Sequence, residues 1–166
     1  MGPEDELVTT TYSTEILAHL AALCEGDPNR EVCGFLVQRE EALQVVPVTN
    51  VADRYHAVDP ERFPRTSREA YVMDAKEQLR LHFDLEAHGG RIVAIWHSHI
   101  DVGAYFSEKD RTDAIIGGLP AMPGAEYLVL GVRAGRATEV KRFRWDGGEF
   151  VDAPLPSELA RALAHR

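Results

Sequence analysis

Hydrophobic positions at helical spacing, together with capping residues, divide the chain into candidate helices. In residues 13–25, four aliphatic residues form one helical stripe: Ile16, Leu17, Leu20 and Leu23. Ser13 or Thr14 is suited to cap this helix, and Gly26 to end it. Similar signals predict three more helices, over 74–88, from Ser107 to about Gly117, and over about 155–165.

Short apolar runs bounded by turn residues predict strands. They cover residues 31–38, 42–50, 91–98, 125–133, 138–145 and 149–153. The first two runs form a predicted hairpin, and so do the last two, which flank the turn Asp146-Gly147-Gly148. Pro47 favours an edge position for the end of its strand. Residues 50–70 are charged and irregular, and we expect a long loop there with a short strand near 55–58.

This order of elements predicts an α/β fold in which helices flank a mixed sheet. The chain has 166 residues, of which 45% are hydrophobic, and it shows neither a repeat nor an interdomain linker. We therefore expect a single domain over residues 1–166, with a core of about 8–152 and a C-terminal helix of about 155–165.

Charge and cysteine content narrow the class of protein. The formal net charge is −9, which argues against nucleic acid and anionic membranes as partners. The basic residues in 133–145 are more simply explained as solvated faces of strands. Two cysteines are too few for a disulfide scaffold. Residues 1–10 lack the features of a signal peptide, and no apolar run is long enough to span a membrane, so a cytoplasmic protein is expected.

Residues 97–110, "HSHIDVGAYFSEKD", contain the strongest candidate for chemistry. His97 and His99 lie two apart on a strand, so both side chains point to the same face with Cα atoms roughly 6.5 Å apart. Two imidazoles at this separation can bind one zinc ion, and Asp110 is the nearest candidate for a third ligand. Two histidines and one carboxylate leave the fourth tetrahedral position for water, as in a catalytic zinc site.

A structural explanation exists for each of these residues. Ser107 and Asp110 have the spacing of a capping box at the start of a helix, and an H-x-H pair can be an exposed strand end. The two explanations are compatible for Ser107 and Asp110, because a cap would fix the helix start and aim the aspartate at the ion.

The same residues resemble the JAMM (MPN+) family of zinc metalloproteases. The stretch fits the family motif H-x-H-x(7)-S-x(2)-D, and "REVCGFLV" supplies the upstream glutamate, Glu31, before a Cys-Gly pair. "PVTNVADRYHAVDP" (47–60) also resembles a family segment. The chain departs from the family at three positions. Trp96 stands where tyrosine is common, and Ile100 and Phe106 stand where proline is common. None of these departures removes a ligand.

The resemblance implies a cytidine-deaminase-like JAMM/MPN fold and assigns a role to each site residue. His97, His99 and Asp110 would bind Zn²⁺. Glu31 would be the general base that accepts a proton from water, and Ser107 would stabilise the oxyanion. Prokaryotic members are expected to cleave peptide or isopeptide bonds after the C-terminal Gly-Gly of ubiquitin-like sulfur-carrier proteins or their conjugates. The oligomeric state stays open, a homodimer included.

Three other functions fit parts of the sequence less well. An MPN-type scaffold without activity usually lacks metal residues, whereas this chain keeps all five motif residues. A zinc nucleobase deaminase needs H-x-E and P-C-x-x-C, which are absent from the sequence. A barrel amidohydrolase needs a longer chain. Among other residues, Cys33 is expected to be core or an oxidation-sensitive neighbour of the site, Gly34 to allow close packing or a bulge, and His56 to be a weaker candidate for substrate contact.

Overall fold

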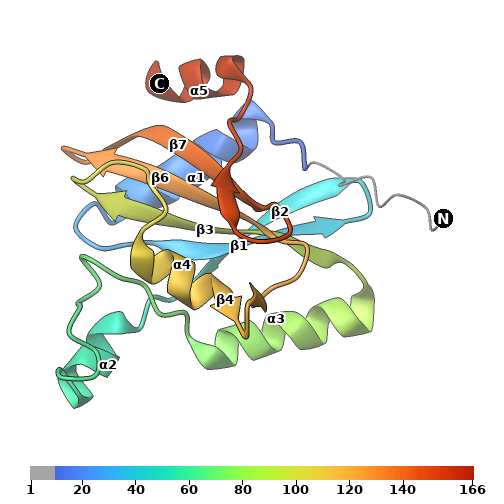
Figure 1. Ribbon diagram of the computed structural model, residues 1–166. Coiled ribbons are helices and arrows are strands. Elements are labelled where there is room, and N and C mark those ends of the chain that lie inside the picture. Colours follow the sequence, from blue (N-terminus) through green and yellow to red (C-terminus); the bar gives the residue numbers. More distant parts are fainter. Residues whose placement is uncertain (1–9) are drawn as a thin grey trace.

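The computed structural model describes residues 10–166 and contains a mixed sheet with helices on both faces (Figure 1). The helices are α1 (Thr14–Gly26), α2 (Ala52–Val58), α3 (Ala75–His88), α4 (Glu108–Ala114) and α5 (Ser157–Ala164). The main strands are β1 (Cys33–Arg39), β2 (Ala42–Val48), β3 (Arg91–Ile100), β6 (Glu126–Arg133), β7 (Arg136–Trp145) and β8 (Phe150–Asp152). A small hairpin consists of β4 (Ile115–Ile116) and β5 (Leu119–Pro120). The predicted fold class is confirmed.

The strand order in the six-stranded sheet of the described residues is β2-β1-β3-β6-β7-β8. Only the central pair within this sheet, β3 and β6, is parallel, and the other neighbours are antiparallel. Parallel neighbours need a crossover connection, because the chain must return to the same end of the sheet. That crossover, residues 101–125, starts directly after His99 and Ile100 and contains α4. The topology therefore brings Ser107 and Asp110 back to the end of β3.

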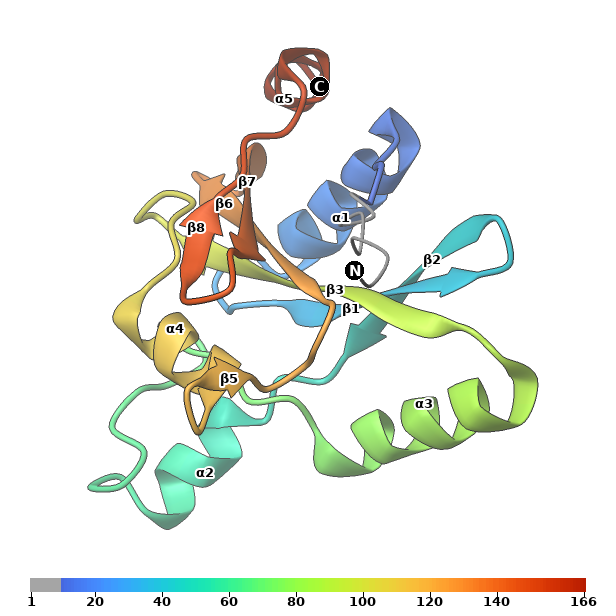
Figure 2. The ribbon, with the colours of Figure 1, turned by 45° about the vertical axis from the view of Figure 1, so that its right-hand side comes forward.

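Alternation along β3 divides the core between the two faces of the sheet. Trp96 and Ile100 belong to the cluster beneath α1 and α5, whereas Ile95 belongs to the cluster beneath α3 and α4. His97 and His99 therefore point to the α4 side, as predicted, and Ser98 to the α1 side. Figure 2 shows α4 and the small hairpin on the side of the sheet opposite α1.

Gly34 is required by close packing between β1, β2 and β3. A Cβ atom at this position would lie 2.3 Å from the Val46 carbonyl oxygen and 2.6 Å from the Trp96 ring. Trp96 is fully buried, and its Nε1–H donates to the Phe35 carbonyl at 3.1 Å. The expectation of close packing at Gly34 is confirmed.

Two predicted elements were wrong. Residues 55–58 are helical and belong to α2, because the Asn50 side chain accepts a hydrogen bond from the Ala52 N–H at 3.0 Å and starts a turn there. The helix from Ser107 ends at Ala114 instead of Gly117. The β-branched pair Ile115-Ile116 prefers extended backbone, and Gly117 and Gly118, with φ of 60° and 80°, form the turn of the small hairpin.

Other boundaries differ by one or two residues. Strand β1 begins at Cys33, not at Glu31, and β3 continues to Ile100. Ser13 caps α1, as predicted, by accepting the Ile16 N–H. The predicted core of about 8–152 begins at residues 8 and 9, which lie outside the described part of the chain, and the single-domain division remains a prediction. Of the helices in residues 10–166, none is long and apolar enough to cross a bilayer.

Candidate active site

His97 and His99 converge at the end of β3. Their Nε2 atoms lie 3.2 Å apart, and both rings are almost completely buried. Asp110 approaches from the first turn of α4, with its Oδ2 atom 3.2 Å from each Nε2. The structure thus brings together the three side chains predicted to be metal ligands.

The start of α4 fixes the Asp110 carboxylate. Ser107 Oγ accepts the Asp110 N–H at 3.0 Å, and Asp110 Oδ2 accepts the Ser107 N–H at 3.0 Å. This reciprocal pair is a capping box. The structural explanation of Ser107 and Asp110 therefore holds, and the cap also aims the aspartate at the two histidines.

The spacing of these three atoms fits a tetrahedral metal ion. Zinc lies about 2.0–2.2 Å from nitrogen and oxygen ligands, and ligand atoms of such a tetrahedron are about 3.3 Å apart. The two Nε2 atoms and Oδ2 form a triangle with sides of 3.2 Å. Two imidazoles and a carboxylate are a common donor set for zinc. If both rings were neutral and donated to Asp110, their Nε2 protons would face each other, whereas a cation would attract all three groups.

The second nitrogen of each ring has a different environment. His99 Nδ1 lies 3.1 Å from the Gly103 carbonyl oxygen, which can only accept, so this nitrogen carries the proton and Nε2 presents a lone pair. Gly103 adopts φ of 84°, which favours glycine there. His97 Nδ1 is buried and has no hydrogen-bond partner in the part of the chain that the structure describes.

Glu31 lies beside the two histidines. Glu31, His97 and His99 each present one possible ligand atom, and these atoms lie within 4.8 Å of one another. Asp110 Oδ2 lies 3.2 Å from both Nε2 atoms, the separation expected for ligands of one tetrahedral zinc ion, so we take Asp110 as the third ligand and Glu31 as its neighbour. Glu31 is 5% exposed, and burial raises its pKa to about 9, with a contribution from the nearby Asp110 carboxylate.

Hydrogen bonds on both sides hold the Glu31 backbone. Its N–H donates to the Ser67 carbonyl at 2.6 Å, and its carbonyl accepts from Asn50 Nδ2 at 2.9 Å. The next residue, Val32, donates its N–H to Ser98 Oγ at 2.8 Å. Glu31 is thus fixed relative to β3 although it precedes β1.

Asn50 is a structural residue that the sequence analysis did not identify individually. Its Nδ2 donates to the carbonyls of Glu31 and Ala70, and its Oδ1 accepts the N–H groups of Ala52 and Val72. All four hydrogen bonds of this nearly buried amide are made, so it ties three segments together. In the sequence, the one indication that Asn50 is important was its position in the stretch 47–60, which resembles a segment of the family.

Burial and neighbouring charges shift the pKa values of the ligand side chains in opposite directions. Burial lowers the pKa of His97, which favours the neutral imidazole that a metal needs. Burial alone would raise the pKa of Asp110, but the neighbouring His97 and the hydrogen bond from the Ser107 N–H hold it well below its usual range. Asp110 is therefore held as a carboxylate, and burial opposes a charge on the His97 ring.

Comparison with known proteins identifies the family. The model for prokaryotic homologs of the JAB domain matches residues 13–146, which is most of the chain. The chain belongs to this family. A relative, the desampylase of Haloferax volcanii, is 33% identical over 146 residues, covering 86% of this chain and 89% of that protein.

Two solved structures share the fold of this JAB-family chain. A solution structure from Desulfitobacterium hafniense has a TM-score of 0.61 at 20% identity and covers 86% of this chain and 88% of its own. A second, from Salinibacter ruber, has a TM-score of 0.52 at 18% identity and covers 88% and 90%. The predicted membership of the prokaryotic JAMM/MPN family and the expectation of a JAMM-type hydrolase are confirmed.

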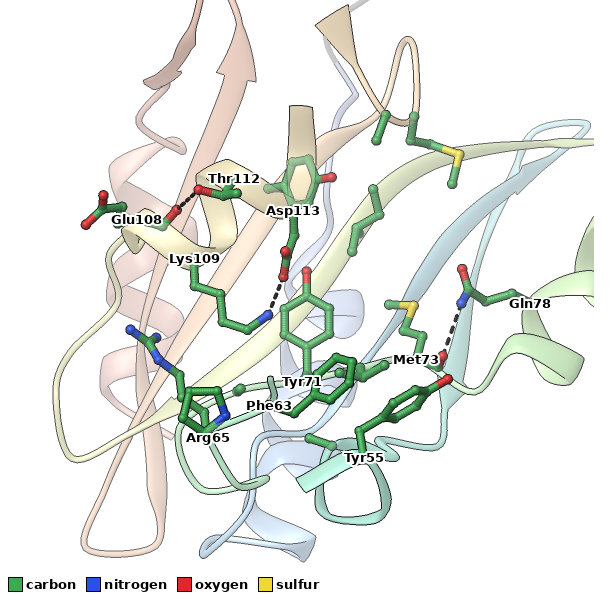
Figure 3. Close-up of a pocket in the computed structure, with 18 of the residues that line it drawn as sticks. Tyr55, Phe63, Arg65, Tyr71, Met73, Gln78, Glu108, Lys109, Thr112 and Asp113 are labelled. Atoms are coloured by element: carbon green, nitrogen blue, oxygen red, sulfur yellow. Dashed lines mark hydrogen bonds and ion pairs between the residues drawn. The ribbon is translucent and has the colours of Figure 1, made fainter. Parts of the chain in front are cut away.

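A cavity of about 870 Å³ opens next to the candidate site of this JAB-family domain (Figure 3). Its walls come from α2 and the segment after it, from α4, and from the sheet. Tyr71 lines the cavity and also packs on His97, with ring centroids 4.5 Å apart. Lys109 and Asp113 form an ion pair on the α4 wall. Tyr71 therefore links the wall of the cavity to the His97 ring.

The other residues singled out in the sequence make contacts that explain them structurally. Cys33 is fully buried and its thiol donates to the Val48 carbonyl, so the core explanation holds. Phe106, which stands where proline is common in the family, stacks on Phe143 at 5.0 Å. Ile100 is buried beneath α1 and α5. His56 lies 2.8 Å from the Phe63 carbonyl oxygen, a contact that links α2 to the segment after it.

Proposed function

We propose that this hydrolase is a zinc-dependent isopeptidase that cleaves after the C-terminal Gly-Gly of a ubiquitin-like sulfur-carrier protein. The observation that carries the proposal is the triangle of His97 Nε2, His99 Nε2 and Asp110 Oδ2 with sides of 3.2 Å. The buried Glu31 carboxylate beside it supplies a group for proton transfer.

His97, His99 and Asp110 would hold the zinc ion. Zinc bound there would act as a Lewis acid, polarising a carbonyl and making water nucleophilic near neutral pH. Glu31 would accept the proton of the attacking water and pass it to the leaving amine. Burial raises the pKa of Glu31 to about 9 in the zinc-free protein, and a zinc ion beside it would lower that pKa toward the range in which a general base works.

Ser107 is proposed to stabilise the oxyanion. Its Oγ accepts the Asp110 N–H, which leaves the hydroxyl proton free to donate to a carbonyl oxygen. Because the capping box fixes the Ser107 backbone, the hydroxyl is held near the ligands without a reorganisation cost. Ser107 is not a nucleophile in this proposal, because the lone pairs of both imidazoles bind the metal.

The substrate class rests on the relative and on the cavity. The Haloferax relative is named for the removal of a ubiquitin-like modifier, and it matches the whole length of the candidate site. The cavity beside His97 has room for an extended peptide segment. An extended tail bound in this cavity would reach the zinc site beside Tyr71, which lines the cavity and packs on His97.

The cellular location follows from the substrate class and the thiols. Cys24 and Cys33 are both free and buried, which suits a reducing compartment. We propose that the enzyme acts in the cytoplasm.

The test is cleavage of purified fusions. The zinc-loaded protein is incubated with a panel of ubiquitin-like proteins whose Gly-Gly ends are linked to a lysine side chain, and the products are weighed by mass spectrometry. Glu31→Gln should retain one zinc per chain and lose about 100- to 10,000-fold in rate. His97→Ala should lose both zinc and cleavage. Cleavage that persists in Glu31→Gln, or after removal of zinc by a chelator, would overturn the proposal.

A further inference from the structure

The two histidines at the site are held in different ways. His99 Nδ1 bonds to the Gly103 carbonyl, so hydrogen bonding fixes the orientation of that ring. His97 Nδ1 has no such partner in the part of the chain that the structure describes. Imidazoles that bind metals almost always make this second hydrogen bond, which orients the ring. A contact other than a hydrogen bond to Nδ1 is therefore needed to orient the His97 ring.

The ring of Tyr71 packs against His97. The ring centroids are 4.5 Å apart and the ring planes meet at 31°, a tilted arrangement in close contact. On the other side of the site, Tyr105 meets His99 edge-on at 4.8 Å and 67°. Of these two tyrosines, Tyr71 is the one that packs on the ring whose Nδ1 has no hydrogen-bond partner in the described residues.

The backbone around Tyr71 is fixed by Asn50. Asn50 Nδ2 donates to the carbonyl of Ala70, and Asn50 Oδ1 accepts the N–H of Val72. The Val72 carbonyl in turn accepts the Val51 N–H at 2.7 Å. The residues on both sides of Tyr71 are therefore held by the same amide that holds the Glu31 carbonyl. The backbone on both sides of Tyr71 is thus held in place, which supports its ring against His97.

We propose that Tyr71 is a positioning residue that holds His97 in its metal-binding orientation by ring packing, in place of the hydrogen bond that His97 lacks. The inference rests on the proposed zinc site. Without the Tyr71 ring, His97 could rotate about its side-chain bonds, and the ligand triangle would be less well formed before zinc binds. The hydroxyl of Tyr71 is not part of this role.

Zinc affinity tests the proposal independently of cleavage. Zinc is partitioned between the protein and a chromophoric chelator, for the wild type and for Tyr71→Phe, Tyr71→Leu and Tyr71→Ala. Loss of a group that orients a metal ligand typically costs about 10- to 100-fold in metal affinity. We expect Tyr71→Phe to stay within about threefold of the wild type, and Tyr71→Leu and Tyr71→Ala to bind zinc at least about tenfold more weakly. Tyr71→Leu keeps apolar bulk in place, so it remains informative if Tyr71→Ala does not fold.

Tyr105→Ala is the matched control, because it removes the aromatic neighbour of the histidine that already has a hydrogen bond. Its zinc affinity should stay within about threefold of the wild type. Wild-type affinity in Tyr71→Leu, or equal losses in Tyr71→Phe and Tyr71→Leu, would overturn the role of the ring. A wild-type protein that binds no zinc would instead refute the metal site itself, so the two failures are distinguishable. Cobalt-loaded variants give a second readout, since a displaced imidazole alters the visible absorption of the metal.

Discussion

Val32 and Ser98 are joined by two hydrogen bonds across the strand junction at the site. Val32 donates its N–H to Ser98 Oγ at 2.8 Å, and Ser98 donates its N–H to the Val32 carbonyl at 2.9 Å. Ser98 lies between His97 and His99 but points to the opposite face, and Val32 directly follows Glu31. The contact thus fixes the candidate base relative to the candidate ligands from behind the sheet.

Ser98→Ala is expected to impair the base without removing the metal. The substitution leaves the partly buried Val32 N–H without its side-chain acceptor, at a cost of about 1 kcal/mol in the free energy of unfolding. Cleavage should slow through kcat, while zinc content stays at one per chain because the histidines are on the other face. Zinc analysis and steady-state kinetics on the same preparation check this. A destabilised variant with wild-type kcat would show that this contact does not position Glu31.

Ser107→Ala separates oxyanion stabilisation from helix capping when it is compared with Ser13→Ala. Each serine caps a helix, since Ser107 Oγ accepts the Asp110 N–H and Ser13 Oγ accepts the Ile16 N–H. Either change should cost about 1 kcal/mol of stability. Ser107→Ala alone should also slow cleavage by about 100- to 1000-fold, because it removes a donor to the oxyanion. Equal rates for the two variants would contradict the proposed role of Ser107.

The stability of the zinc-free protein should depend on pH through Glu31. Burial raises the pKa of Glu31 from its usual value of 4.5 to about 9. The folded protein therefore binds more protons than the unfolded chain between these values, and its stability falls as the pH rises from about 4.5 to about 9. Glu31→Gln has no such proton to lose, so its stability advantage over the wild type should grow across this range.

Urea unfolding at pH 5, 7 and 9 in the presence of a chelator measures this effect. Glu86→Gln, at an exposed position on α3, is the control for the loss of one acid. If Glu31→Gln and the wild type lose stability in parallel as the pH rises, Glu31 is not held in the buried environment described above.

Gly34→Ala should strongly destabilise the fold, whereas Gly26→Ala should not. A Cβ at position 34 would lie 2.3 Å from the Val46 carbonyl oxygen, and nothing lies within 4 Å of one at position 26. Overpacking of this kind costs about 1–3 kcal/mol or more. Gly26 ends α1, where alanine favours the helix. Thermal unfolding of both variants tests the difference, and similar midpoints would contradict the tight packing of β1 against Trp96.

The two thiols should be unreactive in the folded protein. Burial raises the pKa of Cys24 and of Cys33 to about 12, and the thiolate is the reactive form. Iodoacetamide at pH 8 should label neither cysteine in native protein and both in urea. Val58→Cys, which places a thiol at a position that is 83% exposed, is the positive control. Rapid labelling of Cys33 in the folded protein would contradict this prediction and would support the alternative that Cys33 is an oxidation-sensitive neighbour of the site.

The sequence determined the local chemistry of the site. Alternation along a strand placed His97 and His99 on one face, and the Ser107–Asp110 spacing predicted a capped helix start. Both depend on contacts between residues close in the chain. The same locality explains why most helices and strands were predicted. Residues 55–58 were predicted wrongly because the turn before α2 uses the side chain of Asn50, which is held in place by the distant residues Glu31, Ala70 and Val72.

Tertiary structure decided which distant groups meet. The parallel pairing of β3 with β6 forces the crossover that returns Asp110 to the histidines. Asn50 joins the segments of Glu31 and Tyr71 through three hydrogen bonds, to the Glu31 carbonyl, the Ala70 carbonyl and the Val72 N–H, and no spacing in the chain predicts that these groups meet. The sequence likewise did not predict the proposed support of His97 by the Tyr71 ring. Packing of the two rings depends on how two distant segments are placed in the fold and not on their composition.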